Sequence, residues 1–272
     1  MIRLRSLTYL AATALLTPLL AHAATDKTFQ RTLNVTATPD VIVQTGSGDI
    51  HISQGTSNQV AITGTIHMSH WGWGSTNDKD VDQIVNNPPI QQSGNTIKIG
   101  FGNGGSSFFS GNDISIDYDI RIPNGANLKI NSGSGDVRIE GINASLHAET
   151  GSGDINVKGS SLTEAQAETG SGNIQLDAVQ GHLRAHTGSG DVTAAGTPNA
   201  DWYLETGSGD VNLTVPSSSK FRLDAQSSSG DIHSDVALTM QGNLNRGHVS
   251  GSANGGGPTI RVETGSGDIN IH

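Results

Sequence analysis

The segment Thr150-Gly-Ser-Gly-Asp-Ile-Asn-Val157 contains a pentapeptide, Thr-Gly-Ser-Gly-Asp, that recurs almost unchanged along most of the chain and determines its architecture. Between Gly133 and Gly207, the first glycines of successive copies recur with a period of about 18 to 19 residues, and so constant a period predicts stacked coils of constant circumference. The residues expected to form the corners of these coils are Gly46, Asp49, Gly133, Asp136, Gly151, Asp154, Gly170, Asn173, Gly188, Asp191, Gly207, Asp210, Asp231, Gly265 and Asp268.

Residues on both sides of each corner alternate between apolar and polar, which is typical of strands. Leu146, Ala148 and Thr150 share one face, whereas His147 and Glu149 share the other. The sequence therefore predicts an all-β, elongated, β-helix-like β-solenoid with two short strands per coil and about 18 to 19 residues in each coil. One coil cannot bury its apolar face alone, so stability should depend on stacking.

The composition of the corner suggests turn capping. Glycine permits positive φ, and an Asp carboxylate can accept hydrogen bonds from turn amides. Asn173 replaces Asp in one copy and keeps an acceptor oxygen without the charge. Bound calcium is the alternative, but calcium-binding rolls repeat about every nine residues. We therefore expect no cofactor.

The N-terminus has the features of a signal peptide over residues 1–23. Arg3 and Arg5 precede an apolar run from Leu7 to Leu20, and Ala21-His22-Ala23 resembles a cleavage site. The alternative is an N-terminal membrane anchor. No apolar run of about 20 residues follows, so the mature chain is expected to have no transmembrane span. We expect export to the periplasm or secretion from the cell.

Charge and cysteine content exclude several classes of partner and cross-link. The chain has no cysteine, so it cannot form disulfides. Its formal net charge is −10, and removal of residues 1–23 takes away two arginines and no acid, leaving −12. Nucleic acids and anionic membranes both require a cationic face, so neither is an expected partner.

A segment at about residues 68–112 interrupts the repeat and is interpreted as an insertion or end cap, with a short helix expected from Lys79 to Val85. Its aromatic side chains could contact a ligand or seal one end of the stack. A loose metal-like cluster lies nearby, but its spacing fits neither an EF-hand nor a structural zinc site. The possible ligand contacts are Trp71, Trp73, Phe101, Phe108 and Phe109, and the loose cluster comprises His67, His70, Asp78, Asp80 and Asp82.

The outward position before each Thr or Ser forms a second column. It could bind cations or a basic partner, although a solvated outer face is the simpler interpretation. No Gly-x-Ser-x-Gly, His-Glu-x-x-His or phosphate-loop motif occurs in the sequence, which favours a protein that is not an enzyme. The members of the column are Glu149, Glu168, His186, Glu205, Gln226 and Glu263.

The corners, together with Asp117-Tyr-Asp-Ile-Arg-Ile-Pro123 ahead of Leu128-Lys-Ile130, resemble the DUF4097 or Toastrack family. The resemblance extends over about residues 28–272, and related head-GIN domains have similar corners. It implies a β-rich, adhesin-like domain of the cell envelope without an established active site. Residues 24–272 are accordingly expected to form a single domain.

The function expected from these observations is a non-enzymatic, adhesin-like scaffold that binds an envelope protein or a carbohydrate. A β-helical enzyme acting on acidic polysaccharide is one alternative. Such an enzyme needs a basic subsite, whereas the 13 basic residues left after removal of residues 1–23 are dispersed. A purely structural spacer is the other alternative.

Overall fold

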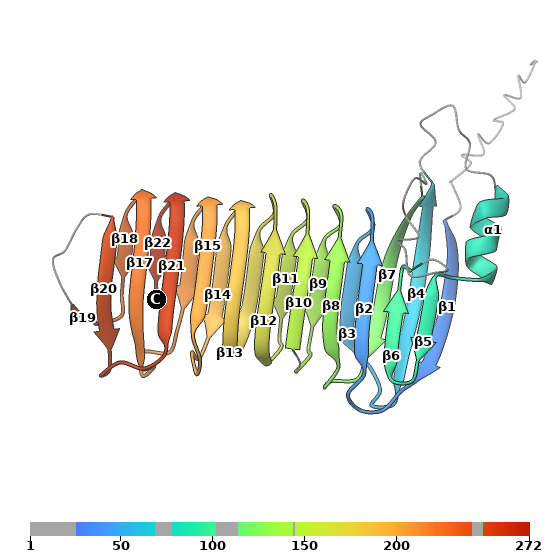
Figure 1. Cartoon of the computed structure of the whole chain (residues 1–272), viewed down its shortest axis with the longest axis horizontal. Helices are drawn as coiled ribbons and strands as arrows, with labels where there is room; N and C mark the ends of the chain where they lie inside the picture. The colour runs from blue at the N-terminus through green and yellow to red at the C-terminus, as the bar shows by residue number, and fades with distance from the viewer. Residues whose placement is uncertain (1–25, 69–77, 102–113, 144, 241–246) are drawn as a thin grey trace, which may run out of the picture.

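The computed structural model describes residues 26–68, 78–101, 114–143, 145–240 and 247–272. They form an elongated stack of strands lying side by side, with the helix α1 (Asp78–Asn86) at one end (Figure 1). The all-β class expected from the sequence is confirmed, and α1 contains the helix predicted from Lys79 to Val85. The expected signal peptide lies outside the described residues. Within the part of the chain that the structure describes, no helix is long and apolar enough to cross a membrane.

The strands before the corners form one row, which we call the leading row. Most of its pairs are parallel, and antiparallel pairs occur only toward its two ends. From end to end it contains β5 (Ile90–Ser93), β6 (Thr96–Ile99), β2 (Asp40–Thr45), β8 (Asn127–Ser132), β10 (Ser145–Thr150), β12 (Leu162–Thr169), the second half of β13 (Ile174–Ser189), β15 (Trp202–Ser208), β21 (Thr259–Ser266), β17 (Phe221–Ser229), β20 (His248–Ala253) and β19 (Thr239–Met240).

The strands after the corners form the trailing row, which β13 joins to the leading row because it takes part in both. Its pairs are parallel except for the two that involve β4. In order it contains β1 (Lys27–Asn34), β4 (Gln59–Met68), β7 (Ile114–Ile122), β3 (Ile50–Gln54), β9 (Val137–Glu140), β11 (Ile155–Lys158), the first half of β13, β14 (Val192–Gly196), β16 (Val211–Thr214), β22 (Ile269–Ile271) and β18 (Ile232–Ser234).

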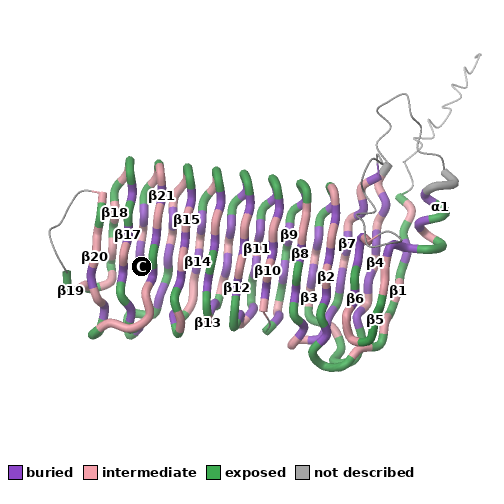
Figure 2. The backbone as a smooth tube through the Cα atoms, in the orientation of Figure 1, coloured by how far each residue is buried: buried purple, intermediate pink, exposed green. Residues whose placement is uncertain are grey.

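Pairing between neighbouring strands keeps equivalent residues opposite one another. Ala148 lies opposite Ile130 on one side and Ala167 on the other, and Ile155 lies opposite Val137 and Ile174. In the central strands, such as β10 and β11, every second residue is buried, as the alternation of colours along them shows (Figure 2). The buried side chains of both rows belong to one apolar cluster, so the core runs along the length of the stack.

Chain order and spatial order differ at both ends of the stack. The last strands, β21 and β22, lie between β15 and β17 and between β16 and β18. Likewise, β2 and β3 lie between strands that come later in the sequence, with β6 and β7 on one side and β8 and β9 on the other. The repeats therefore do not simply stack in the order in which they occur in the sequence.

The segment interpreted as an insertion contributes to the sheet where it is described. β6 pairs in parallel with β2, and Ile97 and Ile99 are buried in the core. β5 pairs with β6 in antiparallel fashion, and α1 packs beside β1 with Val81 and Ile84 buried. This segment therefore adds apolar side chains to the core at one end of the stack.

Candidate functional site

The corner glycines are required by close contact between coils. A Cβ atom added to Gly153 would lie 2.1 Å from the carbonyl oxygen of Gly135 in the neighbouring coil. The same atom on Gly172 would lie 2.0 Å from the oxygen of Gly153. Neither Gly153 nor Gly172 has positive φ, but the equivalent corner glycines Gly190, Gly209 and Gly267 do, with φ of 159°, 156° and 151°. Positive φ also occurs at Gly141 and Gly159, with φ of 71° and 59°, in the turns between coils. A side chain at Gly153 or Gly172 would push neighbouring coils apart.

The Asp side chains of the corners connect one coil to the next. The Oδ1 atom of Asp136 accepts a hydrogen bond at 2.9 Å from the backbone N–H of Asp154, whose own Oδ1 accepts at 2.7 Å from Asn173 N–H. Asn173 passes the pattern on through its amide oxygen, at 2.9 Å from Asp191 N–H. The donor lies in the neighbouring coil, not in the same turn as the sequence suggested. Among the described residues, eight such bonds run through Asp117, Asp49, Asp136, Asp154, Asn173, Asp191, Asp210, Asp268 and Asp231.

A second line of hydrogen bonds is formed by the Thr or Ser residue that precedes each corner. The sequence reasoning missed this line. The Thr169 hydroxyl donates to Gly153 O of the preceding coil at 2.9 Å and accepts from Gly172 N–H of its own corner at 3.1 Å. The sequence feature that could have predicted this line is the hydroxyl residue on the inward face before each corner. The buried members of this line are Thr45, Thr150, Thr169, Thr187, Thr206, Ser227 and Thr264.

We predict that Asp154→Ala lowers the free energy of unfolding by about 1 kcal/mol, because Asn173 N–H loses its acceptor at a solvent-exposed corner. Asp154→Asn should cost less than half of that, since Asn173 already fills an equivalent position with an amide oxygen. Urea denaturation of both variants measures the difference. Equal losses for Ala and Asn would show that the hydrogen bond contributes nothing.

No group of three or more His, Cys, Asp or Glu side chains that could hold a metal occurs among the described residues. His67 contacts Asp117 at 2.8 Å and Asp26 at 3.4 Å, whereas Asp82 pairs with Lys27 at 2.8 Å. His67 and Asp82 thus contact different partners. His70 lies outside the described residues, as do Trp71, Trp73, Phe108 and Phe109. Phe101 is described, and its ring centre lies 5.7 Å from Lys98 Nζ.

The outward face of the leading row carries a network centred on Tyr203. Its hydroxyl donates to Glu205 at 2.8 Å and to Glu263 at 3.2 Å, and the guanidinium of Arg184 lies 5.1 Å from the ring centre. Partial burial, followed by the hydrogen bond to Glu205, raises the pKa of Tyr203 to about 12. The carboxylates of this face are therefore matched by donors on the same face. His147 likewise contacts Glu149 at 2.7 Å.

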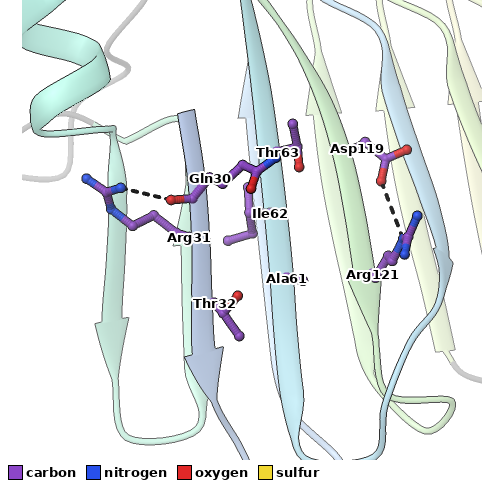
Figure 3. Close-up of a pocket in the computed structure, with 8 residues that line it drawn as sticks. All are labelled: Gln30, Arg31, Thr32, Ala61, Ile62, Thr63, Asp119 and Arg121. Carbon is purple, nitrogen blue, oxygen red and sulfur yellow. Dashed lines mark hydrogen bonds and ion pairs between the residues drawn. The ribbon is translucent and has the colours of Figure 1, made fainter. Parts of the chain in front are cut away.

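A shallow hollow of about 270 Å³ lies on the outward face of β1, β4 and β7, at the α1 end of the stack (Figure 3). The register of these antiparallel strands places its outward side chains in two rows. Arg121 lies at one edge, with its Nε 4.0 Å from Asp119 Oδ1. The hollow was missed by the sequence reasoning, because it involves strands outside the regular repeat. One row consists of Gln30, Thr63 and Asp119, and the other of Thr32, Ala61 and Arg121.

Several solved structures resemble this chain at low sequence identity. A putative cell adhesion protein from Clostridium sporogenes is 15% identical with a TM-score of 0.41, and the match covers 91% of this chain and 99% of that protein. A putative adhesin from Bacteroides fragilis is 14% identical with a TM-score of 0.45, covering 90% and 97%. A putative lipid binding protein from Parabacteroides distasonis is 14% identical with a TM-score of 0.32, covering 90% and 96%. No curated protein matches the sequence.

The family comparison is more direct. The Toastrack DUF4097 family matches residues 106–272, which contain seven of the eight corners. The match is shorter than the 28–272 expected from the resemblance of the corners, but it covers more than half of the chain. The chain therefore belongs to the Toastrack DUF4097 family.

Proposed function

We propose that this protein is an exported, non-enzymatic, adhesin-like scaffold, a β-solenoid whose coils of about 18 to 19 residues present fixed outward faces to other components of the cell envelope. The observation that carries the proposal is the pair of hydrogen-bond lines at the corners, formed by the Asp and the Thr side chains. Both lines connect each coil to its neighbour, so they hold the coils in one register.

A fixed register supports binding because it pre-orders the outward side chains. Glu168, His186 and Glu205 lie directly opposite one another on neighbouring strands. Their positions are set by backbone pairing, so a partner does not have to order them on binding. The stack thus offers straight rows of polar groups over its whole length.

Two titratable groups with shifted pKa values lie away from the hollow at Ala61. Burial raises the pKa of Tyr118, which packs edge-on against Phe29. Hydrogen bonds from His272 and His233 hold the pKa of Asp235 below its usual range, which favours the permanently charged carboxylate. Tyr118 is buried in the core, whereas Asp235 lies with His272 at a separate hollow of about 380 Å³, so neither of these two groups lines the hollow at Ala61.

The proposal predicts saturable binding of the purified, fluorescently labelled protein to isolated envelopes of the source cells. Sedimentation at increasing protein concentration measures it. Linear, non-saturable sedimentation would support a structural spacer and contradict an adhesin-like role. Release of soluble sugar fragments from the envelopes would instead identify an enzyme acting on polysaccharide.

The aromatic residues Trp71, Trp73, Phe101, Phe108 and Phe109 stay our proposed ligand contacts within this function. The double variant Trp71→Ala, Trp73→Ala should bind envelopes at least about tenfold more weakly if these rings stack on a ligand. Unchanged binding by a variant with an unchanged melting temperature would assign the rings to capping.

A further inference from the structure

The hollow on β1, β4 and β7 exists because Ala61 has only a methyl group between two longer side chains. Ala61 lies opposite Thr32 on β1 and opposite Arg121 on β7. In the next row, Thr63 lies between Gln30 and Asp119. The floor is thus a small side chain surrounded by polar ones, with a volume near the lower end of ligand pockets, about 300 Å³.

The polar side chains around the hollow are available for a ligand. Within the described residues, the side chains of Gln30, Thr32 and Thr63 make no hydrogen bond. Hydroxyl and amide groups both donate and accept, so they suit a ligand that also carries hydroxyl groups. Few apolar atoms line the site, so it offers little to a hydrophobic side chain.

Recognition here must come from side chains. β4 is paired on one side with β1 and on the other with β7 over the whole of the hollow. Its backbone N–H and C=O groups are therefore already used. A peptide cannot bind by adding a strand at this place, since that mode requires an unpaired sheet edge.

The charge of the hollow is opposite to that of the chain. Its lining contains two arginines and one aspartate, a formal charge of +1, in a chain of −10. The Arg31 guanidinium donates to Gln30 O at 2.8 Å and Asn86 O at 3.1 Å, and Figure 3 shows it on the far side of β1 from Arg121. It therefore contributes charge without contacting a ligand over Ala61.

Arg121 is the group that can bind an anion directly. Its side chain is 68% exposed, and its only ion pair among the described residues is the 4.0 Å contact with Asp119. The other oxygen of Asp119 is directed to His51 Nδ1 at 3.1 Å. The guanidinium fork of Arg121 is thus free to bind a carboxylate through two parallel hydrogen bonds.

We infer that this hollow binds a carboxylated sugar chain, with the carboxylate on Arg121 and the neighbouring hydroxyls on Thr32, Thr63 and Gln30. The inference rests on the proposed function and names the ligand class for this face. An acidic sugar supplies both features that the hollow matches, a carboxylate and adjacent hydroxyl groups. An acidic peptide supplies only the first.

Calorimetric titration with a short oligogalacturonate tests the assignment, with the methyl-esterified oligomer as the neutral counterpart. We expect the acid form to bind with a dissociation constant on the order of 0.1 to 1 mM and the ester at least about tenfold more weakly. Arg121→Gln should weaken binding of the acid form about tenfold. Arg121→Lys should recover less than half of the binding free energy that Arg121→Gln loses, because Lys lacks the planar fork of the guanidinium. Ala61→Leu, which fills the hollow on the solvent side, should abolish binding.

Arg222→Gln is the matched control, an exposed arginine on β17 toward the other end of the stack, and it should bind like the wild type. Equal affinity of the wild type and Arg121→Gln would overturn the assignment, as would equal binding of the ester or of a tetra-aspartate peptide. If Arg121→Gln binds envelopes as the wild type does, the assignment of the hollow fails and the adhesin-like function stands. If oligogalacturonate binds at Arg121 while envelopes are not bound, the proposed adhesin-like function is contradicted. The assignment of the hollow as a site for carboxylated sugars is then retained.

Discussion

Gly153→Ala should lower the free energy of unfolding by about 3 kcal/mol, at the upper end of the cost of overpacking a core. The added methyl carbon would lie 2.1 Å from Gly135 O and 2.6 Å from Gly135 C, and backbone atoms cannot rotate away as a side chain can. Two coils must move apart, which also stretches the bond from Asp154 N–H to Asp136. Calorimetry should show a melting temperature lower by roughly 6 to 12 °C.

Ser152→Ala is the control for this substitution, because Ser152 is exposed in the same corner and makes no hydrogen bond with a described residue. It should change the melting temperature by less than about 2 °C. A Gly153→Ala variant as stable as Ser152→Ala would show that the coils are not in contact at their corners.

Thr169→Val should be destabilising because it keeps the shape of a buried side chain and removes its hydroxyl. Gly172 N–H then loses its acceptor and Gly153 O loses its donor, and both glycines are buried. Leaving a buried polar group without a partner costs about 1 to 3 kcal/mol, so we expect a loss of about 2 kcal/mol in the free energy of unfolding. Urea denaturation measures the change.

Thr169→Ser keeps the hydroxyl and removes the methyl group, so it distinguishes their contributions. Ser already fills the equivalent position on β17, where Ser227 donates to Gly267 O at 2.9 Å. Thr169→Ser should lower the free energy of unfolding by less than half as much as Thr169→Val does. If Thr169→Val is as stable as the wild type while Thr169→Ser is destabilised, the methyl group accounts for the stability and the hydrogen bonds do not.

Alternation of apolar and polar residues was sufficient to predict the strands around the repeated corners. The pattern of Leu146, Ala148 and Thr150 against His147 and Glu149 agrees with the burial of β10 residue by residue. This pattern is local, because the side-chain period of a strand depends only on its own residues. The short helix was also predictable from its segment alone, as α1 shows.

The role of each corner residue was harder to predict, because it depends on the neighbouring coil. A glycine that needs positive φ and one that needs close contact are identical in sequence, and only the 2.1 Å approach at Gly153 distinguishes them. Similarly, an Asp that caps its own turn and an Asp that caps the next coil use the same carboxylate. Asp136 shows that the second applies here.

The order of the coils in space could not be predicted from the corners, since all of them present nearly the same surface. Thr264-Gly-Ser-Gly-Asp268 can pair with any other copy, and it inserts between β15 and β17. The hollow at Ala61 was missed for a related reason. Its residues come from three strands whose register is set by antiparallel pairing of residues far apart in the sequence.

Hydrogen exchange of the corner amides, followed residue by residue by NMR, tests most directly whether neighbouring coils are joined through their Asp side chains. Asp154 and Asn173 are exposed and Asp210 is partly exposed, yet their N–H groups donate to the preceding coil at 2.7 to 2.9 Å. We predict that these amides exchange as slowly as that of Ile155 at the start of β11, which donates to Asn173 O of the neighbouring coil. Exchange as fast as at the exposed loop residues Thr56 and Ser57 would contradict the stacking of the corners.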